Sequence, residues 1–219
     1  MRYIYFTCLI TVFIFPINTV LAQDKNIIPI SNFSSGNLND WKTKVFSGVT
    51  RYQIIKLDNI FVLSAESHSS ASGLYKEQRI DLYKTPFLNW RWRIANRLPR
   101  LNEQSKSGDD FSARIYIVVK GGWAFWRTKA INYVWAENTR KGVIWPNAFV
   151  GKKAMMVAQR SAKDKIQTWY QEKRNIRQDF KDIFAADIQY IDAIALMTDT
   201  DNSRTDARAY YADIYFSAE

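Results

Sequence analysis

The sequence predicts an all-β protein, a two-sheet antiparallel β-sandwich of the jelly-roll type with one short helix. Apolar and polar residues alternate with the two-residue period of strands, most clearly over residues 88–94. The alternating runs are short and rich in Val, Ile, Tyr, Phe and Trp. They follow one another without the regular strand–helix alternation of parallel sheets, so two packed antiparallel sheets are the simplest arrangement.

The composition limits the chemistry that the domain can perform. The 219 residues are 47% hydrophobic and 24% charged, which is typical of a folded domain and excludes a disordered chain. A single Cys and a single His exclude disulfide frameworks, thiolate-rich zinc sites and most His-dependent triads. Gly-rich phosphate loops and nucleophile elbows are absent from the sequence. What remains is the chemistry of carboxylates, Arg, Tyr and Trp.

Residues 1–22 are predicted to be a helical, cleaved signal peptide. Arg2 is followed by an apolar run, and the small residue Ala22 stands at the expected cleavage point. The alternative is a membrane anchor, but Pro16 interrupts the run before the required length of about 20 residues. Residues 23–40 are then an N-terminal extension and residues 41–219 a single sandwich domain. We expect export, most simply to the periplasm of a Gram-negative bacterium.

The predicted elements follow in chain order. A first hairpin joins residues 51–57 and 60–66 through the two-residue turn Asp58-Asn59. Further strands are predicted at residues 72–82, 88–94, 111–120, 130–136, 153–159, 166–173, 191–198 and 207–217. The helix is predicted at residues 175–184, because Asn175 is a suitable N-cap for an apolar repeat of four. Residues 96–108 and 136–152 form loops long enough either to bind a ligand or to be simple insertions.

The tryptophans divide into two predicted groups. Trp90, Trp92 and Trp135 alternate on strands and are expected in the core. Trp123 and Trp126 lie on a connection that begins with Gly121-Gly122, and Trp145 precedes Pro146. These three are candidate exposed platforms on which sugar rings stack. A hydrophobic loop of this kind is equally suited to contact a membrane or a protein partner.

The net charge of +10 is unevenly distributed. Residues 91–181 hold 20 Lys and Arg against 7 Asp and Glu, whereas residues 182–219 hold 2 against 8. The expected partners of this excess of positive charge are anionic glycans, lipopolysaccharide or phospholipid headgroups. Binding to headgroups would bring the protein into peripheral contact with a membrane. The alternative is a solubilising surface whose charges partly pair within the fold. Nucleic acid is not expected, since no run of Lys and Arg exceeds two residues and no recognition motif occurs.

Six segments together resemble the bacterial family catalogued as domain of unknown function 3047. They are residues 88–94, 106–116, 132–136, 174–179, 197–202 and 210–214. The resemblance spans about residues 40–217 and implies an exported, jelly-roll-like sandwich similar to galactose-binding or carbohydrate-binding modules, without an activity. The chain departs from the family pattern at Ala185 and Ala212, where Gly is typical, and at Ser203-Arg204, where Thr-Gly is common.

Three arginines suggest a ligand-binding face. If the strand of Arg114 neighbours that of Arg91 and Arg93, their guanidiniums line one concave sheet face with Asn89 and Asn132. Such a face suits carboxylated or phosphorylated ligands, because guanidinium pairs with planar anions through two hydrogen bonds. The alternative is that the arginines pair with aspartates inside the fold. The predicted ligand-binding residues are Arg91, Arg93, Asp109, Asp110, Arg114, Tyr116, Asn132, Asp199, Asp201 and Asn202.

Hard oxygen ligands gather after the strand that ends near residue 198. Asp199, Asp201 and Asn202 are candidate ligands of a structural Ca²⁺, and we expect no other cofactor. Use of these side chains in turns is the common alternative for such a short pattern.

These features favour an exported envelope protein that binds a glycan or another anionic envelope component through an Arg/Asp-lined concave face. A second hypothesis is a glycan hydrolase or lyase. Hydrolysis needs two carboxyl groups at a set separation. Asp110 and Asp199 are the candidate catalytic residues, and Glu137 and Glu172 supply further carboxylates. A lyase would instead use Tyr and Arg side chains near a uronate, for which the candidates are Tyr116, Tyr133, Arg91 and Arg114. A third hypothesis is a non-catalytic structural partner of an envelope complex. The oligomeric state does not follow from the sequence.

Overall fold

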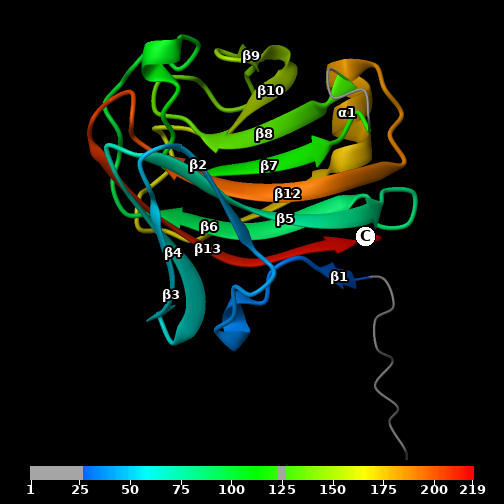
Figure 1. The fold of residues 1–219 in the computed structure, drawn as a ribbon, viewed down its shortest axis with the longest axis horizontal. Coiled ribbons are helices and arrows are strands. Elements are labelled where there is room, and N and C mark those ends of the chain that lie inside the picture. The colour runs from blue at the N-terminus through cyan, green and yellow to red at the C-terminus, as the bar shows by residue number, and fades with distance from the viewer. Residues whose placement is uncertain (1–26, 123–126) are drawn as a thin grey trace, which may run out of the picture.

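The computed structural model describes residues 27–122 and 127–219, and their strands form two sheets packed as a β-sandwich (Figure 1). The predicted fold class is thereby confirmed. The predicted signal peptide, and Trp123 and Trp126, lie outside the described residues. Within the described ranges, no helix is long and apolar enough to cross a membrane.

The six-stranded sheet is antiparallel throughout its described pairs. Strand β13 lies at its centre and pairs with β6, β4 and the short β1. The order is β11 (Tyr170–Asn175), β6 (Phe87–Ile94), β13 (Asp206–Ser217), β4 (Ile60–His68) and β3 (Arg51–Leu57), with β1 (Ile27–Pro29) beside β13.

The seven-stranded sheet contains one parallel pair, β8 with β10, among antiparallel neighbours. Its order is β2 (Lys42–Ser47), β5 (Ala71–Asp81), β12 (Tyr190–Asp199), β7 (Arg114–Val119), β8 (Lys129–Trp135), β10 (Gly151–Arg160) and β9 (Ile144–Asn147). The chain between β8 and β10 runs back along the sheet, and β9 forms part of that return. Strands β1, β2 and β9 were not predicted, because they are short or, in β2, exposed along their whole length, so burial imposes no alternation on them.

Local signals predicted the helix and one turn correctly. Helix α1 (Ile176–Phe184) begins after Asn175, whose Oδ1 accepts a hydrogen bond from the backbone N–H of Gln178 at 3.0 Å. It ends at Ala185, which adopts the left-handed conformation with φ of 50°. Asp58 and Asn59 have φ of 50° and 65°, as a two-residue hairpin turn requires.

Two apolar layers enclose the seven-stranded sheet. The main core lies between the sheets and contains Trp90, Trp92 and Trp135, as predicted. A second cluster, which includes Val134 and Trp145, covers part of the outer face of the sheet beneath residues 136–150. The expectation that Trp145 is an exposed platform is therefore wrong, since the residue is 3% exposed. This cluster holds the loop 136–150 against the sheet and so positions one wall of the site described next.

Candidate functional site

A cleft with a volume of about 480 Å³ crosses the outer face of the seven-stranded sheet. Its polar lining comes from β7, β12 and the segments beside them, and consists of Asp109, Arg114, Tyr116, Asn147, Asp199, Asp201 and Asn202. Apolar side chains from the two edges of the sheet complete it. Phe46 on β2 is 65% exposed, and Phe149 and Val150 before β10 are also exposed. The cleft therefore combines a polar floor with an apolar rim.

Strand alternation directs the floor residues away from the core. Ile115 and Ile117 of β7 are buried between the sheets, so Arg114 and Tyr116 point to the opposite face. Met197 of β12 pairs in register with Arg114, which brings the end of β12 and Asp199 beside the start of β7. Figure 1 shows α1 at the other end of these strands, so the cleft floor lies away from the helix.

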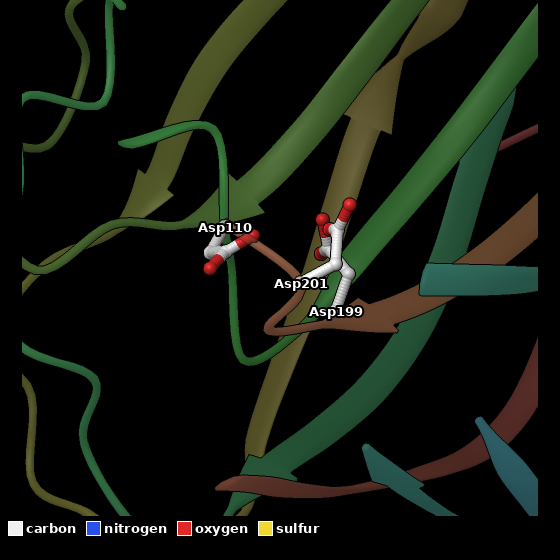
Figure 2. A group of neighbouring side chains, drawn as sticks. All are labelled: Asp110, Asp199 and Asp201. Atoms are coloured by element: carbon white, nitrogen blue, oxygen red, sulfur yellow. The ribbon is translucent and has the colours of Figure 1, made fainter. Parts of the chain in front are cut away.

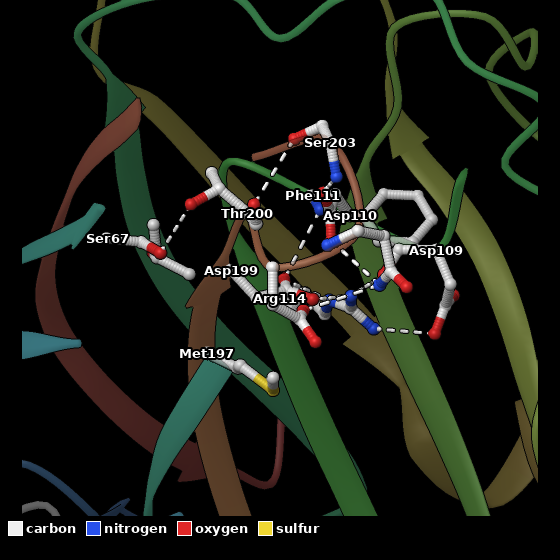
Figure 3. Close-up of polar contacts among 12 residues, drawn as sticks. Ser67, Asp109, Asp110, Phe111, Arg114, Met197, Asp199, Thr200 and Ser203 are labelled. Carbon is white, nitrogen blue, oxygen red and sulfur yellow. Dashed lines mark hydrogen bonds and ion pairs between the residues drawn. The ribbon is translucent and has the colours of Figure 1, made fainter. Parts of the chain in front are cut away.

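Arg114 is the buried centre of the floor, with only 2% of its surface exposed. Its Nε donates to Asp199 Oδ1 at 2.7 Å and its Nη2 donates to Asp199 Oδ2 and to the Asp109 carbonyl. Its Nη1 donates to Tyr116 Oη at 3.2 Å. The same Nη1 donates to Asp109 Oδ2 at 3.5 Å (Figure 3). The guanidinium also lies over the Phe111 ring, 4.5 Å from its centroid. Each guanidinium nitrogen thus donates to the protein itself.

Burial changes the protonation of the neighbouring acids. It raises the pKa of Asp199 to about 8, with Arg114 acting in the opposite direction and Asp110 and Asp109 adding to the rise. Burial also raises the pKa of Asp109, which Arg114 and Asn147 oppose. The pKa of Tyr116 rises to about 12 through burial, so its hydroxyl stays protonated. The floor contains three carboxyl groups, of Asp109, Asp199 and Asp201, and a single guanidinium, and the carboxyl group of Asp110 lies behind them.

Asp110 organises the loop that closes one end of the cleft. Its Oδ1 accepts hydrogen bonds from the backbone N–H and Nδ2 of Asn202, at 3.3 and 3.0 Å. Its Oδ2 accepts from the backbone N–H of Ser203 at 2.5 Å. Because both oxygens face the loop, Asp110 positions Asp201 and Asn202 and is not itself part of the cleft lining.

Asp110, Asp199 and Asp201 form the acidic group shown in Figure 2, with one oxygen of each within 4.8 Å of the others. Ca²⁺ takes six to eight oxygen ligands in proteins. Here Asp110 is engaged by three N–H donors and Asp199 by Arg114 and the N–H of Phe111. Asn202 donates to Asp110 and Asp201 through its Nδ2. This donor set offers few free oxygens to a cation, so the expectation of Ca²⁺ gains no support from it and stays a prediction.

Two buried acceptors in this region have no hydrogen-bond partner among the described residues. They are Oδ1 of Asp109 and Oδ1 of Asn132. Asn132 is the register partner of Tyr116 on the adjacent strand, and its Nδ2 contacts the sulfur of Met156 at 3.3 Å. Asn132 is fully buried and does not line the cleft, whereas Asp109 does. The free acceptor of Asp109 suits a ligand that brings hydroxyl or amide donors.

The prediction of one arginine face is wrong. Arg91 and Arg93 lie on β6 of the six-stranded sheet, whereas Arg114 lies on β7 of the other sheet. Arg91 pairs with Asp213 at 3.0 Å and Arg93 with Asp58 at 2.9 Å, both on the far outer face. Alternation shows that all three point outward, but it does not show to which sheet each strand belongs.

The additional catalytic candidates also lie apart from the cleft. Glu172 is buried, and its carboxylate accepts hydrogen bonds from Trp92, Gln159 and Arg160. Glu137 lines a different pocket and pairs with Arg97 at 3.1 Å.

Sequence reasoning missed the rim of the cleft. Phe46 lies on an edge strand that has no burial pattern, and Phe149 lies in a loop whose path depends on the second apolar cluster. Asn147 was also missed, although its Nδ2 donates to Asp109 at 3.2 Å. The apolar pairs Val45-Phe46 and Phe149-Val150, outside any predicted strand, were the available signal.

A family model described as a protein of unknown function, DUF3047, matches residues 39–215. No curated protein matches the chain.

Several solved structures are similar in outline. One is a family 11 carbohydrate-binding module from Clostridium thermocellum in complex with a β-1,3-1,4-mixed-linked tetrasaccharide, with a TM-score of 0.48 at 9% identity over 88% of this chain and 95% of that chain. Another is the xyloglucanase domain of NopAA, a type three effector from Sinorhizobium fredii, in complex with cellobiose, with a TM-score of 0.44 at 8% identity over 82% of this chain and 93% of that chain.

Proposed function

The chain belongs to the DUF3047 family of proteins of unknown function, and we propose that it is an exported glycan-binding protein whose cleft on the seven-stranded sheet holds a neutral stretch of glycan. The observation that carries this proposal is the combination of an acceptor-rich floor with an apolar rim. Sugar rings have the complementary character, because their hydroxyl groups donate hydrogen bonds while their C–H faces pack on aromatic side chains. The volume of about 480 Å³ lies in the range of small-ligand sites.

The state of Arg114 favours a neutral ligand over an anionic one at this position. Its guanidinium already donates to Asp199, Asp109 and Tyr116, so an anion would have to displace a buried carboxylate. Asp201 lines the same cleft, and burial together with Asp110 raises its pKa. A sugar hydroxyl can donate a hydrogen bond to Asp201. An anionic group of a ligand would instead be repelled by the carboxylates of this end of the cleft.

Calorimetric titration of residues 23–219 with a panel of neutral β-linked oligosaccharides tests this proposal. We expect Phe149→Ala to weaken binding of the best ligand about 10-fold, because the exposed ring is a wall of the cleft. Phe61→Ala is the matched control, since Phe61 is an exposed aromatic residue that does not line the cleft. Absence of binding to every neutral oligosaccharide, or an equal loss in both variants, would overturn the proposal.

A second candidate function is glycan hydrolysis by the same carboxyl groups. The raised pKa of Asp199 favours it, because a general acid must hold a proton near neutral pH. The engagement of Asp199 by Arg114 and of Asp110 by the loop opposes it, since neither carboxyl group is free to reach a glycosidic bond. Incubation with the bound glycan and measurement of new reducing ends distinguishes the two functions. Product release that Asp199→Asn abolishes would establish the enzyme.

A further inference from the structure

A second concave site lies where β8 and β10 end, at the tip of the sandwich. This basic pocket, with a volume of about 360 Å³, has four exposed cationic side chains in its lining, those of Arg100, Arg140, Lys141 and Lys163. None of the four forms an ion pair within residues 27–122 and 127–219. Part of the excess of positive charge in the middle of the sequence therefore gathers in one pocket without a salt bridge to neutralise it.

The loop that carries Arg140 and Lys141 is held in place by the carboxylate of Glu103. Glu103 is buried, and its Oε1 accepts hydrogen bonds from the backbone N–H groups of Glu137 and Asn138, at 2.5 and 3.1 Å. Its Oε2 accepts from the N–H of Thr139 at 2.8 Å. Gly142, with φ of 88°, then donates its N–H to the Ala158 carbonyl at 2.8 Å. Arg140 and Lys141 thus project from a backbone held on both sides.

The one carboxylate in the lining does not cancel this charge. Glu137 pairs with Arg97, whose Nη1 lies 3.1 Å from Glu137 Oε2, and Arg97 is outside the lining. Four positive charges therefore face an anionic group that enters the pocket, without a free carboxylate to repel it. Asn138, Thr139 and Ser161 add amide and hydroxyl groups to the same lining.

We propose that the basic pocket binds the anionic groups of an acidic polysaccharide. Lys and Arg side chains recognise the carboxylate of a uronate and a sulfate ester through the same charge-assisted hydrogen bonds. The hydroxyl and amide groups beside them suit the sugar ring that bears the anion. This inference concerns a site separate from the cleft and does not depend on the function proposed for the cleft.

The shape of the pocket favours a glycan over a membrane surface. The pocket is concave, and its lining contains no large apolar side chain among the described residues that could insert between lipids. The exposed apolar residues Phe46, Phe149 and Val150 line the cleft instead. One loop nevertheless connects the two sites, since its first part lines the basic pocket and its last part, with Asn147, lines the cleft.

Binding of polygalacturonate oligosaccharides to residues 23–219 at low and high salt tests the proposal. We expect the double variant Arg140→Ala/Lys141→Ala to weaken binding at least 10-fold and to reduce its salt dependence. The matched control is Lys152→Ala/Lys153→Ala, which removes two adjacent exposed charges on β10 outside either site and should change binding less than 3-fold. All four side chains are exposed, so the unfolding midpoint of both double variants should match that of the parent protein.

Two further probes define the ligand class. Dextran sulfate that binds as tightly as polygalacturonate, with the same loss in Arg140→Ala/Lys141→Ala, supports recognition of any anionic group on a glycan. Weaker binding of dextran sulfate supports selection of carboxylates. The proposal is overturned if neither polymer binds at low salt, if both double variants lose binding equally, or if only phosphatidylserine vesicles bind. Phe61→Ala, which lies outside both the cleft and the basic pocket, should leave polygalacturonate binding unchanged.

Discussion

Arg114 and Arg91 occupy comparable positions on the two outer faces of the sandwich, and each pairs with an aspartate. The side chains of Arg114 and Asp199 are 3% and 2% exposed, whereas those of Arg91 and Asp213 are 35% and 45% exposed. The loops around residues 109–110 and 200–203 cover the first pair. The second pair stays partly exposed in a hollow of about 250 Å³, with the Trp169 ring centroid 5.8 Å from Arg91. An Arg–Asp pair is therefore buried in the floor of a cleft on one face and partly exposed to water on the other.

The difference in burial predicts a difference in energetic role. Removing one partner of a buried pair leaves the polar groups of the other without their hydrogen bonds and counter-charge, at a cost of about 3–5 kcal/mol. An exposed pair contributes about 0–1 kcal/mol, because water screens the charges. We expect Arg114 to be required for the shape of the cleft, and Arg91 to be dispensable.

The largest expected effect is that of Arg114→Ala. It leaves Asp199 and Asp109 without their cationic partner, and should lower the free energy of unfolding by about 3–5 kcal/mol in urea denaturation. Arg91→Ala should lower it by less than about 1 kcal/mol. Equal losses in the two variants would contradict the distinction between the faces.

The second effect is a pH dependence centred on Asp199. Its pKa is raised to about 8 in the folded protein from a usual value of 3.8, so between these values the folded state holds a proton that the unfolded state has released. The contribution of Asp199 to stability is therefore present at low pH and lost as pH rises from about 4 to 8, by up to about 1.4 kcal/mol per pH unit. Asp199→Asn should remove this component of the slope in denaturation series at pH 5, 6 and 7. Asp213→Asn makes the same substitution in the pair on the other face and is the matched control.

Asp110→Ala should have the third largest effect. The substitution removes the acceptors of three N–H groups in the loop of Asn202 and Ser203, and we expect a loss of about 2 kcal/mol. Faster hydrogen exchange at the Ser203 amide would show that the loop has loosened. Asp213→Ala removes only the surface contact with Arg91, and should leave this amide unchanged.

The smallest effect is expected at a position remote from both arginine pairs. Ala185 ends α1 with φ of 50°, a conformation that Gly adopts without strain. Ala185→Gly should raise the free energy of unfolding by about 0.5–1 kcal/mol, and calorimetric melting measures it. A gain of this size measures the effect of backbone strain alone on the free energy of unfolding. The effects of the substitutions at charged residues can then be compared with it. A loss of stability would contradict the assignment of strain to this residue.

Much of the local structure was determined by the sequence itself. Asn175 and the apolar repeat after it specify α1, Asp58-Asn59 specifies a hairpin turn, and alternation on β6 and β7 specifies which side chains leave the core. These features depend on residues a few positions apart, so a local pattern suffices to predict them.

Only the tertiary structure decided how these elements combine. Arg114 and Asp199 are 85 positions apart and meet because β7 pairs with β12, while β6, with the same alternation, joins the other sheet. Alternation of apolar and polar residues along a strand indicates which face of the sheet a side chain occupies, but it does not indicate which strands are neighbours. The cleft and the basic pocket also depend on the loop 136–150, whose course is set by Trp145 packing on the sheet and by Glu103 capping its backbone. Contacts between distant segments are selected by the packing of the whole chain, and for that reason the sites emerged only from the folded molecule.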